Sequence, residues 1–209
     1  MPTAQAQTLV RYIFSNSNPT IESSNITADN AVWTIGGASF GGGDKAAYAK
    51  NTTLTTVFDS GEYLELTVNA DSGYALDLNS FSFELGGSNN TLVDAISYAQ
   101  VRSSVDGYST SLTMTPGAVT EATVNNPAGG SFSASKTPLT ISLSGSEYQE
   151  LSSFTLRIYA YATGEENAFW KADNASFYGT VAAVPEPASV SLIIGLSGLG
   201  LAFWCRRRK

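Results

Sequence analysis

Apolar and polar residues alternate with a period of two in four stretches of the chain, at 63–68, 81–85, 139–143 and 153–163. The longest stretch places Phe154, Leu156, Ile158 and Ala160 on one side and Thr155, Arg157, Tyr159 and Tyr161 on the other. Such alternation predicts strands that bury one face, and turns rich in Gly, Asn and Asp separate the runs. No stretch before Val184 has a helical stripe, and 36–43 is predicted to be a long flexible loop. The pattern predicts an all-β, antiparallel, jelly-roll-like β-sandwich of about nine or ten strands over residues 8–181.

The pattern changes after this predicted sandwich. Residues 182–187 form a linker with the sequence Pro185-Glu186-Pro187, and residues 188–205 are an apolar run without any charged side chain. As a helix this run would measure about 27 Å, close to the hydrocarbon thickness of a bilayer. The chain then closes on Arg206, Arg207, Arg208 and Lys209. A buried core helix would explain the apolar run, but a single transmembrane helix with a basic, stop-transfer cytoplasmic tail at 206–209 also explains the four bases.

The N-terminus bears on export. Residues 1–14 contain no apolar core of the length that a signal peptide requires, although Ala4-Gln5-Ala6 has the small residues typical of the end of one. We therefore interpret residues 1–7 as the remnant of a signal-peptide cleavage region, with the rest of the signal encoded upstream. An arbitrary polar leader is the alternative. Under the first interpretation the export machinery is a partner of the protein.

The tail as a whole resembles the PEP-CTERM sorting signal of Gram-negative bacteria, which exosortases recognise. The likeness covers residues 184–209 and consists of a Pro-Glu-Pro motif, a glycine-containing apolar helix and a basic cluster, in that order. It implies that Pro185, Glu186 and Pro187 form the recognition element for an exosortase-type processing enzyme. It also implies inner-membrane anchoring through the C-terminus before processing, and a place at the cell surface or outside the cell afterwards. Two prolines deny the motif a helix and keep it extended.

Composition excludes several classes of function. The 209 residues include no histidine, and the single Cys205 lies in the apolar run. This removes catalytic Ser-His-Asp and Cys-His systems, histidine-ligated zinc and a disulfide framework. Four of the 11 basic residues stand at the last four positions, so residues 1–205 carry seven bases against 18 acids, a net charge of −11. A body this acidic argues against a nucleic-acid partner and favours a neutral or cationic ligand.

Aromatic residues suggest how the body makes contact with a ligand. An exposed aromatic ring is a stacking platform for the apolar face of a sugar, and the alternation at 153–163 puts Arg157, Tyr159 and Tyr161 together on the outward side. We predict that these three residues form a ligand-binding face, with Trp170 as a neighbour. The alternative is that the rings serve packing and β-propensity. If the three residues do bind a ligand, the chain is an exported, noncatalytic cell-surface or matrix module that contacts polysaccharide. An exported glycoside hydrolase that works through carboxylates alone, and a purely structural surface protein, are the other hypotheses.

Segment 101–108 resembles a strand–turn element of the sandwich domains that such exported proteins carry, and segment 172–179 resembles the closing segment of carbohydrate-binding jelly rolls. The resemblance of the second implies that Asp173 and Asn174 hold a structural calcium ion. The same two residues also read as an ordinary turn. No other cofactor and no catalytic residue is predicted.

Overall fold

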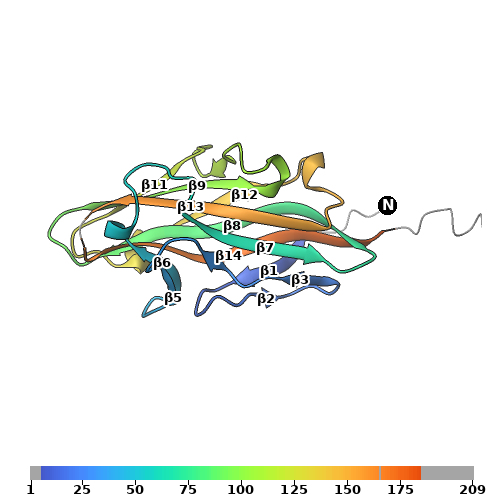
Figure 1. Cartoon of the computed structure of the whole chain (residues 1–209), viewed down its shortest axis with the longest axis horizontal. Helices are drawn as coiled ribbons and strands as arrows, with labels where there is room; N and C mark the ends of the chain where they lie inside the picture. The colour runs from blue at the N-terminus through green and yellow to red at the C-terminus, as the bar shows by residue number, and fades with distance from the viewer. Residues whose placement is uncertain (1–5, 165, 185–209) are drawn as a thin grey trace, which may run out of the picture.

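The structure is a computed structural model that describes residues 6–164 and 166–184 (Figure 1). Its strands are β1 (Gln7–Tyr12), β2 (Thr20–Ile21), β3 (Ile26–Ala28), β4 (Val32–Trp33), β5 (Ser39–Gly41), β6 (Ala46–Lys50), β7 (Tyr63–Ala70), β8 (Tyr74–Asn89), β9 (Ala95–Ser103), β10 (Met114–Thr115), β11 (Ala122–Asn126), β12 (Thr137–Ser142), β13 (Ser153–Thr163) and β14 (Ala168–Ala183). One short helix, α1 (Phe132–Ser135), and three single 3₁₀ turns complete the described part.

The strands form two antiparallel sheets. An eight-stranded sheet has the order β10-β12-β8-β14-β1-β2, and the hairpin of β5 and β6 is added where β6 pairs with β14. A six-stranded sheet has the order β11-β9-β13-β7-β3, with β4 also paired to β7. Strands β7, β8 and β9 alternate between the two sheets, and so do β12, β13 and β14. This alternation favours the predicted jelly-roll topology. The structure confirms the antiparallel sandwich, and the jelly-roll topology stays a prediction.

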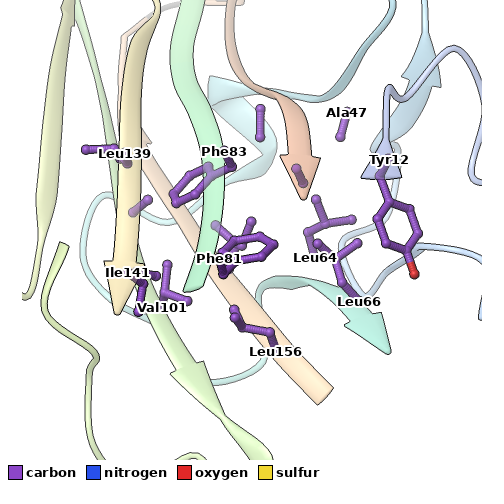
Figure 2. Packing of buried hydrophobic residues seen from close by; sticks show 14 of the residues in the cluster. Tyr12, Ala47, Leu64, Leu66, Phe81, Phe83, Val101, Leu139, Ile141 and Leu156 are labelled. Atoms are coloured by element: carbon purple, nitrogen blue, oxygen red, sulfur yellow. The ribbon is translucent and has the colours of Figure 1, made fainter. Parts of the chain in front are cut away.

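The hydrophobic core lies between the two sheets, as Figure 2 shows. Phe81 and Phe83 of β8 and Leu139 and Ile141 of β12 enter it from the eight-stranded sheet, and all four are almost completely buried. Leu64, Leu66, Val101 and Leu156 enter it from the six-stranded sheet. Apart from Val101 of β9, these are apolar positions of the period-two stretches, so the prediction of which side of β7, β8, β12 and β13 is buried is confirmed.

Three sequence-based expectations need correction. The described residues form fourteen strands rather than nine or ten, because two- and three-residue strands such as β2 and β10 leave no period to detect. The supposed loop 36–43 contains β5, which pairs with β6. The first strand begins at Gln7, inside the segment assigned to the cleavage region, and the last strand continues to Ala183, beyond the expected end of the sandwich at 181.

The predicted transmembrane helix at 188–205, the basic tail and the Pro-Glu-Pro motif lie outside the described residues. Within residues 6–164 and 166–184, no helix has the length and apolar character needed to cross a membrane.

Candidate ligand-binding site

Strand β13 turns Tyr159 and Tyr161 away from the core, as the alternation predicted. Their neighbours Ile158 and Ala160 belong to the core cluster. Yet the side chains of Tyr159 and Tyr161 are only 2% and 4% exposed. The prediction that both rings lie open to a ligand is therefore wrong, although the prediction of the side on which they lie is right.

The cover over these two rings comes from a distant segment of the chain. Residues 54–62 run beside the end of β13, where the Ala160 N–H donates to the Glu62 carbonyl at 3.1 Å. Phe58 lies in this segment, and its ring centroid is 5.1 Å from that of Tyr159 and 6.4 Å from that of Tyr161. Tyr98 of β9 stacks parallel to Tyr161 at 5.2 Å. Burial and the Glu121 carboxylate, to which the Tyr161 hydroxyl donates, raise the pKa of Tyr161, so this hydroxyl stays protonated.

Two arginines complete this outer layer. The Arg102 guanidinium lies 4.3 Å from the centroid of the Phe58 ring. Arg157 lies between two rings, 4.2 Å from the centroid of Tyr63 and 3.7 Å from that of Tyr108, and its Nε donates to Glu65 at 2.8 Å. Such distances are those of cation–π contacts. We call Phe58, Tyr63, Tyr98, Tyr108, Arg102 and Arg157 the aromatic face; the four rings and both arginines are half-buried.

Trp170 does not belong to this face. Its side chain is fully buried in the core, where its ring meets Trp33 edge to face at 5.6 Å and its Nε1–H donates to the Tyr98 carbonyl at 2.8 Å. On β14 the inward positions are Ala168, Trp170 and Ala172, while Phe169 and Lys171 point outward. The prediction of Trp170 as a neighbour of the binding residues is therefore wrong.

A cleft of about 400 Å³ lies on the outer face of the other, eight-stranded sheet. Tyr48 of β6 and Phe169 of β14 meet there edge to face, with ring centroids 6.2 Å apart. Lys171 stands directly opposite Tyr48 in the pairing of β14 with β6, and its ammonium forms an ion pair with the Asp44 carboxylate. The remaining lining consists of Ser88, Asn90, Ser131 and the backbone of Gly41–Gly43 and Gly129–Gly130.

Two buried amide side chains hold the loops around this cleft. The Asn89 Nδ2 donates to the carbonyls of Val93 and Asn126, at 2.7 and 2.9 Å, and the Asn89 backbone N–H donates to Gly130 at 2.8 Å. The Asn126 side chain donates to Ser97 at 2.9 Å. The loop after β8 and the loop before α1 are thus tied to one another. Sequence reasoning missed this cleft, because its residues come from four segments that only strand pairing brings together.

Asp173 and Asn174 lie within β14, at an irregularity in its pairing with β8, rather than in a turn between strands. The Asn174 Nδ2 donates to Glu84 at 2.8 Å, and the Lys136 ammonium lies 2.8 Å from the same carboxylate oxygen. The pKa of Asp173 is raised to about 6, chiefly by burial. The charge of Glu84 acts in the same direction, and the hydrogen bond from the Asn174 backbone N–H acts against it.

The same residues do not suit calcium. Calcium takes six to eight oxygen ligands, whereas a lysine ammonium and an amide NH₂ group already face Glu84 here. Within the described part of the chain, no three carboxylate, histidine or cysteine side chains are grouped so that they could hold a metal ion. The residues present therefore do not fit the calcium ion that the sequence resemblance implied.

Comparison with known proteins identifies the tail. Residues 183–209 match the PEP-CTERM protein-sorting motif, which confirms the resemblance seen at Pro185, Glu186 and Pro187. This motif indicates an exported protein and implies processing by an exosortase. No curated protein matches the chain.

Among solved structures, the chain is similar to TmCBM27, a carbohydrate-binding module with specific mannan recognition, at 10% identity and a TM-score of 0.33, covering 85% of this chain and 99% of that one. The K1 cleaved adhesin domain of Lys-gingipain from Porphyromonas gingivalis matches at 12% identity and 0.37, covering 87% and 100%. A family 6 carbohydrate-binding module matches at 13% identity and 0.31, covering 81% and 93%. With TM-scores this low, these proteins add nothing on what the chain binds.

Proposed function

We propose that the protein is an exported, noncatalytic module that contacts polysaccharide at the cell surface or in the extracellular matrix. The sorting motif at 183–209 supports export. The aromatic face carries the proposal of polysaccharide contact: four half-buried rings and two arginines occupy the solvent side of a sheet, where an ordinary sandwich has small polar residues.

The chemistry of this face suits a sugar chain. A pyranose ring has one face of C–H groups, which packs against a flat aromatic ring, and a rim of hydroxyls, which accept hydrogen bonds from a guanidinium. Arg157 is fixed by Glu65 and by the rings of Tyr63 and Tyr108, so little side-chain entropy is lost when a ligand binds. In the corrected form of the binding-face hypothesis, Tyr159 and Tyr161 support the contact layer from beneath.

The hydrolase alternative can be assessed at the cross-strand neighbours Glu84 and Asp173. A glycosidase needs two carboxylates that flank the scissile bond, one as acid and one as base or nucleophile. Here Glu84 lines a cleft of about 250 Å³. Its carboxylate is nevertheless occupied by Lys136 and Asn174, and the Oδ1 of Asp173 beside it is buried, which favours the noncatalytic function.

Binding of polysaccharide by the full-length protein in detergent micelles tests the proposal. The double variant Tyr63→Ser, Tyr98→Ser removes two half-buried rings, and we expect it to lose about tenfold or more in affinity, since stacking on aromatic rings is the main contact. The matched control is Tyr178→Ser, which removes a half-buried tyrosine from the outer face of the other sheet. Equal binding by all three proteins would refute the role of the aromatic face.

Release of reducing ends, measured in the same samples, separates the hydrolase hypothesis. Turnover by the wild type that is abolished in Glu84→Gln would contradict the noncatalytic function. A wild-type protein that neither binds nor cleaves any polysaccharide would favour the structural alternative.

A further inference from the structure

The cleft on the eight-stranded sheet is separate from the aromatic face, which belongs to the six-stranded sheet. We propose that the cleft is a second binding site and that it takes one or two rings of a neutral sugar. This inference rests on the proposed polysaccharide contact, and it adds that the cleft selects neutral sugars. A volume of about 400 Å³ is at the lower end of the range for ligand pockets, which suits a short segment rather than a long chain.

One wall of the cleft is aromatic and bare. Tyr48 and Phe169 are half-buried, so part of each ring faces the cleft. The loop above them contains Gly42, whose backbone has a φ of +69°, a conformation that favours glycine. A Cβ at this position would approach the Tyr48 ring to 3.6 Å. The glycine therefore keeps a side chain off the Tyr48 ring, and the C–H face of a sugar can pack on the exposed part of that ring.

The other wall of the cleft has one charged hydrogen-bond donor, Lys171, and one charged acceptor, Asp44. The Lys171 ammonium donates hydrogen bonds and the Asp44 carboxylate accepts them, and the two form an ion pair with no net charge. A sugar hydroxyl both donates and accepts, so neighbouring hydroxyls can bond to Asp44 and Lys171 together. A carboxylate on the ligand would be attracted by the Lys171 ammonium but repelled by the Asp44 carboxylate. The paired charges thus select a neutral sugar over an acidic one.

The walls of the cleft are held in place by the protein itself. Lys171 has only 12% of its side chain exposed and lies 5.8 Å from the Phe169 ring, so its position is fixed by packing. The loop bearing Gly129–Gly130 is tied to β8 through the Asn89 N–H and the Gly130 carbonyl. Preformed walls reduce the entropy lost on binding, as expected for a recognition site.

The test measures binding of three soluble neutral oligosaccharides, cellohexaose, mannohexaose and maltohexaose, and of the acidic trigalacturonate, to the full-length protein in detergent by calorimetry. We expect the wild type to bind at least one neutral sugar more tightly than trigalacturonate. Asp44→Asn removes the acceptor and leaves Lys171 unpaired. It should weaken neutral-sugar binding about tenfold or more and strengthen binding of trigalacturonate. A purely structural role for Asp44 would not produce that reversal.

Tyr48→Ala provides a second, independent variant, and we expect it to lose neutral-sugar binding while thermal melting checks its fold. The matched control is Glu166→Gln, which breaks the exposed ion pair of Lys50 and Glu166 near the same end of β14 and should bind as the wild type does. If Asp44→Asn and Tyr48→Ala bind neutral sugars as the wild type does while Tyr63→Ser, Tyr98→Ser loses binding, the cleft is not a site and the proposed function stands. If the wild type binds none of the four sugars and no polysaccharide, both proposals fall.

Discussion

Asp173 makes the stability of this protein depend on pH. Its side chain lies where the pairing of β14 with β8 is irregular. Its Oδ1 is buried and has no hydrogen-bond partner among residues 6–164 and 166–184. Burial is the largest cause that moves the pKa of this carboxyl from its ordinary value of 3.8 to about 6, and the nearby charge of Glu84 acts in the same direction. The ionised form is therefore disfavoured in the folded protein relative to the unfolded chain.

The sign and the size of the effect follow from this difference. Between pH 3.8 and about pH 6 the folded protein keeps a proton that the unfolded chain has lost, so the free energy of unfolding falls as pH rises through this window. Two pKa units correspond to about 3 kcal/mol at most. Because the side chain is only partly buried, solvent screening reduces the expected penalty at pH 7 to about 1–2 kcal/mol. The substitution Asp173→Asn keeps the shape of the side chain and removes this penalty.

Urea unfolding of the full-length protein, followed from pH 3.5 to pH 8, measures the difference. Asp173→Asn should be about 1–2 kcal/mol more stable than the wild type at pH 7 and equal to it at pH 3.5, where both side chains are uncharged. Asp71→Asn, at an exposed position in the turn between β7 and β8, is the matched control and should differ little at any pH. A variant that is less stable than the wild type at pH 7, or a difference that does not change with pH, would refute the reasoning.

Two further predictions concern the buried tyrosines and the sorting motif. Tyr159→Ala and Tyr161→Ala should each lower the free energy of unfolding by about 2–4 kcal/mol, approaching Phe154→Ala, because Phe58 covers both tyrosine rings; thermal melting that leaves either variant at the wild-type temperature would contradict this. Replacement of residues 185–187 by alanine should block processing of the exported protein and leave the body folded, as immunoblots of the membrane fraction can show; trimming at the wild-type rate would argue against the sorting function.

Local alternation predicts the faces of the strands but not what covers them. Phe154 and Ile158 follow from period two, and so does the outward side of Tyr159. The burial of Tyr159 depends on Phe58, which lies about a hundred residues earlier, and no local pattern contains that contact. Local sequence also fails to predict the burial of Trp170. In the sequence 168–172, apolar residues stand on both sides of β14, and only the pairing with β6 and β8 decides which side faces the core.

The cleft could not be predicted for a related reason. Tyr48 and Lys171 are separated by most of the chain, and the register of β6 against β14 makes them opposite neighbours. The glycines 41–43 suggest a loop from the sequence. In the structure they line the cleft without side chains, and this leaves part of the Tyr48 ring exposed. The chemistry of single residues is visible in a sequence, whereas their meeting in a site depends on strand pairing.

Strand β14 joins the proposed sugar cleft to the sorting motif. Its first residues carry the cleft through Phe169 and Lys171, and its last residue, Ala183, pairs with Tyr74 just before the sorting motif. From Lys171 to Ala183 an antiparallel strand spans about 40 Å. Figure 1 shows β6 toward one end of the long axis and the end of β14, in red, at the other. The Val184 N–H still donates to the Gly73 carbonyl at 2.9 Å, so the sandwich leads into the motif without a spacer. Processing at the motif would leave the proposed sugar cleft unchanged, because Phe169 and Lys171 lie at the opposite end of β14.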